Sequence, residues 1–394
     1  PVMRIVYCGC FRLPNFDAAA PRVLNNAKAF RKMGHEVKFI SWGGKYREED
    51  LCEDGMYRVD GLEYVITHEL DATGGFFNKL KAKLKRGQKT LMLLEQIIEK
   101  PDLIIMYNAD CSWTRKMQKF CNQYKIKLAN DITEWYDNNE LHLADIIPNY
   151  INMTSTQRLI KNKIVISSFL NSYYSESNNI IIPPLCDPEE PKWSATVEDD
   201  RVKPFDGITL IYAGNPAKKD CIHSVINAVN TLANEGKAIR FLILGTTRGA
   251  YMKQYAQLLL STSLHENMKF LGRVSQDLIP AYYKKADFMV LLREPNRKSM
   301  AGFPTKFAES MTAGVPVITN ATSDLTKYVI NGKTGFLVEG YDYESILFTL
   351  RSSLFTIRKE DVKKMKKNCV HSANLTFDWH HRVTDFDHFL QNLR

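Results

Sequence analysis

Residue types that could bind a negatively charged ligand gather in one segment, LLREPNRKSMAGFPTKFAESMTAGVPVITN (291–320). An apolar strand is predicted to end near Leu292, and a cationic loop leads from it into a helix that ends at Gly314. The loop cations are Arg293, Arg297 and Lys298, and the residues around the helix start are Gly302, Phe303, Pro304, Thr305 and Lys306. Because the amides and the dipole at a helix start attract anions, this arrangement predicts a diphosphate site.

Glu309 lies one helical turn behind that site. It follows Thr305 by four residues and Lys306 by three, which puts it on the helix face that both share. A carboxylate at this distance from a diphosphate could accept two hydrogen bonds from the diol of a ribose. The alternative is a surface ion pair between Glu309 and Lys306.

The charge balance also indicates an anionic partner. The chain has 53 Lys and Arg against 44 Asp and Glu, a net charge of +9, which favours nucleic acid, a membrane surface or a phosphate-bearing ligand. The stretch KLKAKLKRGQK (79–89) has six basic side chains and no acid, and it follows Phe76 and Phe77. We expect peripheral membrane contact through 76–89, with a solvated basic helix as the alternative. Nucleic acid is not expected, because no aromatic residues alternate with the basic ones.

The remaining composition is that of a cytoplasmic α/β protein. No apolar run reaches the length of a spanning helix, and the N-terminus reads as a strand rather than a signal peptide. The eight cysteines form no C-x-x-C pair and are expected to be reduced thiols. No cluster with metal-ligand spacing occurs, so neither a metal nor a cofactor is expected.

Strand-like and helix-like stretches alternate along all 394 residues. This alternation predicts parallel sheets covered by helices. Proline and acidic residues concentrate at 183–207, as in a connection between domains, and a fresh alternation starts at GITLIYAGN (207–215). In such sheets ligands bind beyond the carboxyl ends of the strands. We therefore expect chemistry in the loops that follow strands.

The segment 291–320, with NGKTG (331–335) behind it, resembles glycosyltransferase family 4, a group of retaining enzymes that use nucleotide sugars. KFLGRV (269–274), which ends at Val274, is similar to the family's FLGxV stretch. Further similar stretches are AAAPRVLNNAKAFRKMGHEVKFIS (18–41), YYKKADFMVLL (282–292) and IIPPLCD (181–187). The resemblance implies the GT-B fold, in which two Rossmann-like domains face each other across a cleft. It predicts an acceptor-binding domain at 1–187, a donor-binding domain at 188–375, and a helix at 376–394 that packs back on the first domain.

The resemblance also assigns roles within the donor site. It implies that Glu309 binds the ribose. GNPAKKD (214–220) corresponds to the family's GRxxxxKG stretch, whose arginine and lysine hold the donor diphosphate. Lys219 matches the lysine after Gly214, although a solvated loop lysine is the alternative, and Asn215 replaces the arginine. A replacement cation is expected from Arg297, Lys298 or Arg22.

A second departure from the family lies eight residues before Glu309. Family members carry a glutamate there, near the donor sugar, and this chain has Ala301. We expect Ser299, or the amides around Gly302 and Phe303, to substitute for the missing carboxylate.

The first half of the chain is expected to bind the acceptor. In KLANDITEWYDNNELH (127–142), Asp131 ends a predicted strand and could orient the acceptor hydroxyl or the donor ring, or could cap a helix. Glu134, Trp135 and Tyr136 follow it, and aromatic rings with carboxylates suit sugar surfaces.

The sequence thus predicts a retaining glycosyltransferase that uses a nucleotide-diphosphate sugar of the UDP or GDP type. The acceptor is expected to be a saccharide or lipid-linked saccharide hydroxyl in cell-surface polysaccharide synthesis. The catalytic residues are expected to be Lys219, Asp131 and Arg297. Alternatives are another GT-B enzyme, such as an inverting transferase or a UDP-sugar 2-epimerase, and a non-catalytic relative that binds nucleotides or glycans.

Overall fold

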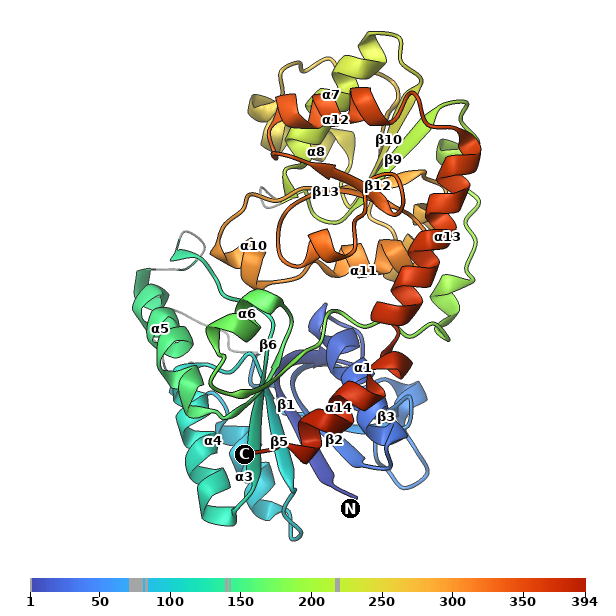
Figure 1. Ribbon diagram of the computed structural model, residues 1–394. Coiled ribbons are helices and arrows are strands. Elements are labelled where there is room, and N and C mark those ends of the chain that lie inside the picture. The colour runs from blue at the N-terminus through green and yellow to red at the C-terminus, as the bar shows by residue number, and fades with distance from the viewer. Residues whose placement is uncertain (1, 71–80, 82–83, 139–140, 142, 217–219) are drawn as a thin grey trace. The chain divides into compact units, whose positions relative to one another are not determined.

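The computed structural model describes residues 2–70, 81, 84–138, 141, 143–216 and 220–394. The chain divides into two compact units (Figure 1). The first unit contains Pro1–Leu185, Ala301–Phe303 and Trp379–Arg394, and the second contains Cys186–Met300 and Pro304–Asp378. Each unit is described by itself.

The first unit is built on an eight-stranded sheet of order β3-β4-β2-β1-β5-β6-β7-β8. All its pairings are parallel except that of β3 with β4. The strands are β1 (Arg4–Leu13), β2 (Glu36–Gly44), β3 (Arg58–Val59), β4 (Leu62–Ile66), β5 (Leu103–Tyr107), β6 (Lys127–Ile132), β7 (Asn162–Val165) and β8 (Asn178–Ile181). Every residue of β5 is buried, as expected of a central strand covered on both faces.

Two apolar cores cover the two faces of this sheet. Successive residues of β1 point to opposite faces, so Tyr7 joins one core and Cys8 the other. The first core also contains residues of α1 and α14, and the second contains residues of α3 and α4. The α-helices that the structure describes in this unit are α1 (Ala19–Lys32), α3 (Gln88–Gln96), α4 (Cys111–Tyr124), α5 (Leu143–Thr154), α6 (Ser168–Tyr173) and α14 (Val383–Gln391).

The sequence predicted one continuous helix at 376–394, and the structure differs from this prediction. A long helix, α13 (Lys359–Thr376), ends in the second unit, a 3-10 turn (Trp379–Arg382) follows, and α14 begins at Val383. The apolar side chains still face inward, and the ring centroids of Phe30 in α1 and Phe386 in α14 lie 4.8 Å apart. Residues 379–394 therefore complete the core of the first unit.

The second unit contains a six-stranded parallel sheet of order β11-β10-β9-β12-β13-β14. The strands are β9 (Ile208–Ala213), β10 (Ile239–Leu244), β11 (Met268–Gly272), β12 (Phe288–Leu291), β13 (Val317–Asn320) and β14 (Gly335–Val338). The helices in this part of the chain are α7 (Ile222–Asn234), α8 (Arg248–Tyr255), α9 (Ile279–Tyr283), α10 (Arg297–Ala301), α11 (Thr305–Thr312), α12 (Tyr343–Ser353) and α13. Figure 1 shows α7 and α12 on one side of this sheet and α11 on the other.

Both sheets reverse their strand order at one point, between β1 and β5 in the first unit and between β9 and β12 in the second. In open α/β sheets, ligands bind beyond the carboxyl ends of the strands at such a point. The loops after β9 and β12 contain 214–220 and the start of the segment 291–320. The fold therefore directs attention to the stretches that the sequence singled out.

The described residues include no helix that is both long and apolar enough to cross a bilayer. All eight cysteines are free thiols, as predicted. Of the stretch 76–89, the structure describes residues 81 and 84–89, while 76–80, 82 and 83 lie outside the described residues.

Candidate functional site

A cluster of charged side chains occupies the carboxyl ends of β9 and β12. At its centre is Asp220, whose side chain is fully buried. Its Oδ2 lies 2.5 Å from Nζ of Lys306 in α11, and its Oδ1 lies 3.2 Å from Nε of Arg293. Tyr212 of β9 donates its hydroxyl to Asp220 Oδ2 at 2.7 Å. Two cations thus share one carboxylate.

The neighbouring strands fix both cations in place. Asn320, the last residue of β13, accepts a hydrogen bond from the Arg293 amide at 2.9 Å and donates one to the Arg293 carbonyl at 2.6 Å. Lys306 Nζ lies 4.5 Å from the ring centre of Tyr212. The side chains of Arg293 and Lys306 are 18% and 19% exposed, so each keeps some contact with solvent.

Gly214 makes room for the Lys306 side chain. Its φ is +148°, and a Cβ built on it would come within 2.5 Å of Lys306 Nζ and 2.7 Å of Lys306 Cε. A larger residue here would therefore displace the ammonium group from the strand edge. The sequence listed Gly214 as a donor-site residue from the resemblance, and the structure supplies this steric reason for glycine.

The neighbouring charges and burial change the pKa of Asp220 in opposite directions. Burial alone would raise its pKa, but the charges of Lys306 and Arg293, with the hydrogen bonds from Lys306 and Tyr212, outweigh it and lower the pKa to about 2. Burial and the Asp220 charge raise the pKa of Tyr212 above its usual range. At neutral pH the cluster therefore contains a carboxylate, two cations and a neutral phenol.

The helix α11 begins where the sequence predicted it. Pro304 is the N-cap residue, and its side chain makes no capping hydrogen bond. Thr305 is exposed in the first turn. At the other end, Gly314 has a φ of +75° and donates its amide to the Met311 carbonyl, which confirms it as the terminating glycine.

Glu309 is half-buried in the second turn of α11. Among the described residues, none donates a hydrogen bond to its carboxylate. Burial raises its pKa above the ordinary value, against the opposing charge of Lys192, which itself pairs with Glu190 at 2.7 Å. A partly desolvated carboxylate without a donor is suited to accept hydrogen bonds from a ligand diol.

The remaining donor-site predictions have mixed outcomes. Arg297 and Lys298 are half-buried in the first turn of α10. Ser299 Oγ donates to the Glu294 carbonyl at 2.7 Å and accepts from the Asn296 amide at 3.0 Å. Ser299 is thus engaged in the structure of its own loop, contrary to the expectation that it replaces the carboxylate missing at Ala301.

Four other predicted residues are placed without a clear role. Gly302 and the buried Phe303 connect α10 to α11, and Val274 follows the edge strand β11. Asn215 is exposed, and its carbonyl oxygen lies 2.9 Å from the hydroxyl oxygen of Tyr212. Lys219 lies outside the described residues.

Sequence reasoning missed Asp220 as a site residue and did not single out Arg293. Arg293 appeared as one of three loop cations, and nothing local set it apart from Arg297. Asp220 was the last residue of the stretch 214–220 and was given no role of its own. Their roles become visible when the strand order places the ends of β9 and β12 side by side.

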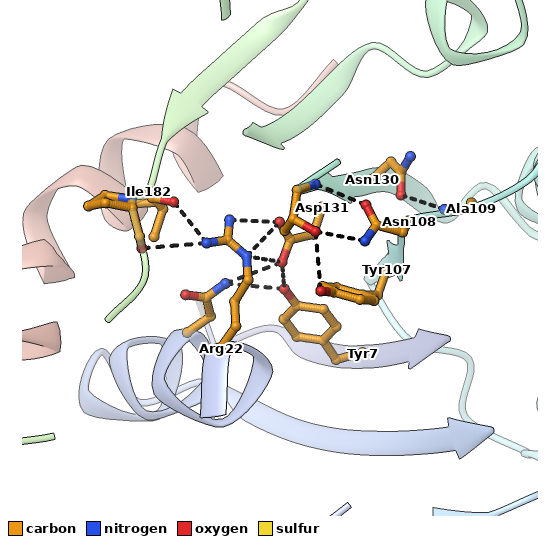
Figure 2. A network of polar contacts seen from close by, with 11 residues as sticks. Tyr7, Arg22, Tyr107, Asn108, Ala109, Asn130, Asp131 and Ile182 are labelled. Atoms are coloured by element: carbon orange, nitrogen blue, oxygen red, sulfur yellow. Dashed lines mark hydrogen bonds and ion pairs between the residues drawn. The ribbon is translucent and has the colours of Figure 1, made fainter. Parts of the chain in front are cut away.

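The first unit contains a second buried charged network (Figure 2). Asp131, at the end of β6, is fully buried and forms a salt bridge of 2.8 Å with Arg22 of α1. Arg22 also donates to the carbonyl of Ile182 at 2.8 Å, and Tyr7 donates its hydroxyl to Asp131. Asp131 also accepts from Arg22 Nε, and Asn26 donates to Tyr7 at 3.2 Å.

This network corrects two predictions. Arg22 was expected to supply a phosphate cation and Asp131 to orient a hydroxyl or a sugar ring. Arg22 is 5% exposed and Asp131 0%, and each is bonded within the unit. A buried charge must be paired to be tolerated, so this geometry indicates that the pair holds α1, β6 and the chain after β8 together.

The predicted acceptor residues differ in exposure. Trp135 is 4% exposed, and its ring packs edge-on against Tyr173 with centroids 4.7 Å apart. The expectation of an acceptor platform at Trp135 is therefore corrected, because its ring is part of the core. Tyr136 is exposed and Glu134 half-buried, so both can meet a ligand.

Two Rossmann-like parallel sheets with covering helices define the GT-B fold of glycosyltransferases. Nearly the whole chain is similar in structure to sucrose-phosphate synthase from Thermosynechococcus elongatus, with a TM-score of 0.73 at 15% identity over 99% of this chain and 98% of that one. Anabaena Alr3699/HepE in complex with UDP and glucose gives 0.69 at 14% identity, over 99% of this chain and 100% of that one. At these identities the likeness shows the fold.

The sequence of the second half gives a more particular result. Residues 196–369 match the family described as "Glycosyl transferases group 1". The chain is also similar to the capsular polysaccharide biosynthesis glycosyltransferase CapM of Staphylococcus aureus, at 26% identity over 141 residues. That match covers 36% of this chain and 35% of CapM, so it spans about a third of the length of this curated relative.

Proposed function

We propose that the protein transfers a sugar from a nucleotide-diphosphate sugar to a hydroxyl of a saccharide or lipid-linked saccharide. The observation that carries the proposal is the pair of cations, Arg293 and Lys306, that Asp220 holds at the switch point of the second sheet. The match of residues 196–369 to group 1 glycosyltransferases supports it. The similarity to CapM favours cell-surface polysaccharide synthesis as the setting.

In this proposal the second unit binds the donor. Arg293, Lys306 and the start of α11 offset the negative charge that develops on the leaving diphosphate. Glu309 accepts hydrogen bonds from the ribose diol. The structure of HepE is a complex with UDP and glucose. We therefore propose a UDP-type donor for this chain, and a GDP-type donor is the other candidate.

The proposed reaction retains the configuration of the sugar. The acceptor hydroxyl attacks the anomeric carbon on the face from which the diphosphate leaves, the bond to the diphosphate breaks, and a phosphate oxygen takes the hydroxyl proton. This route needs neither a separate protein base nor a metal. With Ala301 in the position of the usual glutamate, the sugar is positioned by other groups, among which we propose Arg297 and the amides of Gly302 and Phe303. Lys219 is proposed as a further diphosphate contact.

Turnover assays test this function. The 394-residue chain is given a panel of UDP- and GDP-sugars, and release of the nucleoside diphosphate is measured with and without saccharide acceptors. We expect release from one donor, and a retained anomeric configuration in the product by NMR. Removal of one charge that stabilises a developing anion costs about 100-fold in rate, so Arg293→Met should lose about that factor in kcat/KM.

The control is Arg351→Met, which removes a surface arginine paired with Glu235 in the same unit. Equal activity of the two variants contradicts the role of Arg293. An inverted product favours the inverting alternative, and donor binding without turnover favours a non-catalytic relative.

Glu309 is tested separately from catalysis. Glu309→Ala should weaken binding of UDP or GDP and leave binding of the corresponding 2′,3′-dideoxynucleotide unchanged, because the dideoxy sugar has no diol. Equal losses for both ligands contradict a contact between Glu309 and the ribose.

A further inference from the structure

The helix α5 presents apolar side chains to solvent on one face. Leu143, Ile147, Tyr150 and Ile151 are 89%, 69%, 59% and 40% exposed. Their spacing of four, three and one residues puts them on one side of the helix. Isolated exposed apolar residues are ordinary, but a contiguous apolar stripe of this kind marks an interaction surface.

The opposite side of α5 is already engaged in the first unit. Asn152 donates to the Ala109 carbonyl at 2.9 Å, and the Pro148 carbonyl accepts from Cys111 Sγ at 3.4 Å. Met153 is 5% exposed. The helix is therefore held in place by contacts that leave the apolar stripe outward.

Basic side chains also lie on α4, the helix that α5 contacts. The helix α4 begins at Cys111, carries Arg115, Lys116 and Lys119, and contains no acidic residue. Figure 1 shows α4 and α5 next to each other. Arg115 follows Cys111 by one helical turn, so it lies on the same face as the contact with α5.

The segment just before α3 adds to this surface. Lys116 Nζ donates to the Leu84 carbonyl at 2.6 Å, and Arg86 pairs with Asp110 at 3.4 Å. Leu84 is 63% exposed, and Lys85 is exposed as well. The described part of the basic segment thus lies beside α4, with a leucine and a lysine facing solvent.

We infer that α5, with the cations of α4 and Lys85, docks on the surface of an anionic lipid bilayer. An amphipathic helix with apolar side chains on one face and lysines or arginines beside it lies in the plane of such an interface. The apolar stripe enters the boundary between headgroups and acyl chains, and the cations contact lipid phosphates. This inference does not depend on donor binding, and either can fail alone.

A second copy of the chain is a poorer occupant. A two-fold contact through this surface brings the same patch of each copy together. The cations of α4 in one copy would then approach the same cations in the other copy. The first turn of α5 has one acidic residue, Asp145, to offset their repulsion. An anionic bilayer satisfies both the apolar stripe and the positive charge.

Sedimentation with vesicles tests the inference on the 394-residue chain. Vesicles of phosphatidylcholine mixed with phosphatidylglycerol should sediment the protein, and vesicles of phosphatidylcholine alone should not. The variant with Leu143→Ser and Ile147→Ser should bind the mixed vesicles at least about tenfold more weakly, as should the variant with Arg115→Glu and Lys119→Glu. The control is Phe348→Ser, which removes a 73% exposed phenylalanine from α12 of the second unit and should bind like wild type.

Two results overturn the inference. One is a failure of vesicle binding to behave as expected: either the wild type does not sediment with the mixed vesicles, or both double variants sediment with them to the same extent as the wild type. The other is a wild-type dimer in sedimentation velocity that the α5 variant converts to a monomer, which assigns the stripe to contacts between copies. The charge-reversal variant leaves α5 intact, so the test holds even if the serine variant fails to fold.

Discussion

Replacement of Asp220 by asparagine isolates the charge that organises the proposed donor site. Asparagine has the shape of the protonated aspartic acid and can still accept the Tyr212 hydroxyl. The difference between the two side chains is therefore the stabilisation that Lys306 and Arg293 give to the ionised carboxylate. Asp220 is fully buried, so solvent screens this stabilisation little.

The magnitude follows from the pKa of Asp220, which lies at about 2 in the folded protein against an ordinary 3.8. This difference corresponds to roughly 2 kcal/mol. Because the folded pKa is depressed, the contribution is fully present above pH 3.8 and is lost as the pH falls through about 2. At pH 3 about half of it should remain.

The assay is differential scanning calorimetry, with the transition of the second unit followed in wild type and Asp220→Asn. For a unit of this size we expect the variant to melt about 5–10 °C lower at neutral pH. The difference should be constant between about pH 7 and 5 and should narrow towards pH 3. Asp206→Asn, which changes a carboxylate that is 99% exposed, is the control and should leave the transition unchanged. Equal melting temperatures at neutral pH, or a difference that does not depend on pH, refute the reasoning.

Two further predictions concern the first unit. Arg22→Met leaves the buried Asp131 carboxylate without its cation, so unfolding of this unit by urea should become about 3–5 kcal/mol easier, and an unchanged unfolding midpoint argues against a structural ion pair. Lys163 is fully buried, bonds to Ser177 Oγ, and has a pKa that burial lowers from 10.5 to about 7. Because the unfolded chain binds this proton more readily, stability should rise between pH 7 and 8.5 by up to about 1.4 kcal/mol per pH unit. Lys163→Met should remove that rise while the exposed neighbour Lys161→Met keeps it, and an identical pH dependence in both variants contradicts the assignment.

Much of the fold could be predicted from local sequence patterns. Strands such as LIIMY (103–107) are short continuous apolar runs, and such a run is typical of a strand that is buried on both faces of a parallel sheet. The short hairpin of β3 and β4 was missed because β3 has two residues. Asp60 and Gly61, both with positive φ, form its turn, and the Asp-Gly pair was a signal for it.

The site could be predicted less completely, because its charges pair over long distances in the sequence. Arg22 and Asp131 are separated by 109 residues, and Lys306 and Asp220 by 86. Sequence spacing alone shows neither pair. Arg22, Asp131 and Lys306 were each interpreted as candidate ligand contacts, and Asp220 was given no role. Burial distinguishes the two pairs, because the side chains of Arg22 and Asp131 are 5% and 0% exposed, whereas that of Lys306 is 19% exposed.

The central claim is that Lys306 and Arg293 hold the diphosphate of the donor, and a ligand comparison tests it most directly. Isothermal titration calorimetry is carried out with the nucleoside diphosphate and the matching monophosphate on wild type, Lys306→Met and the surface control Lys359→Met. A charge-assisted hydrogen bond contributes about 1.5–3 kcal/mol, so wild type and control should prefer the diphosphate by at least about tenfold. Lys306→Met should lose most of that preference. A variant that keeps the wild-type ratio of the two affinities contradicts the account.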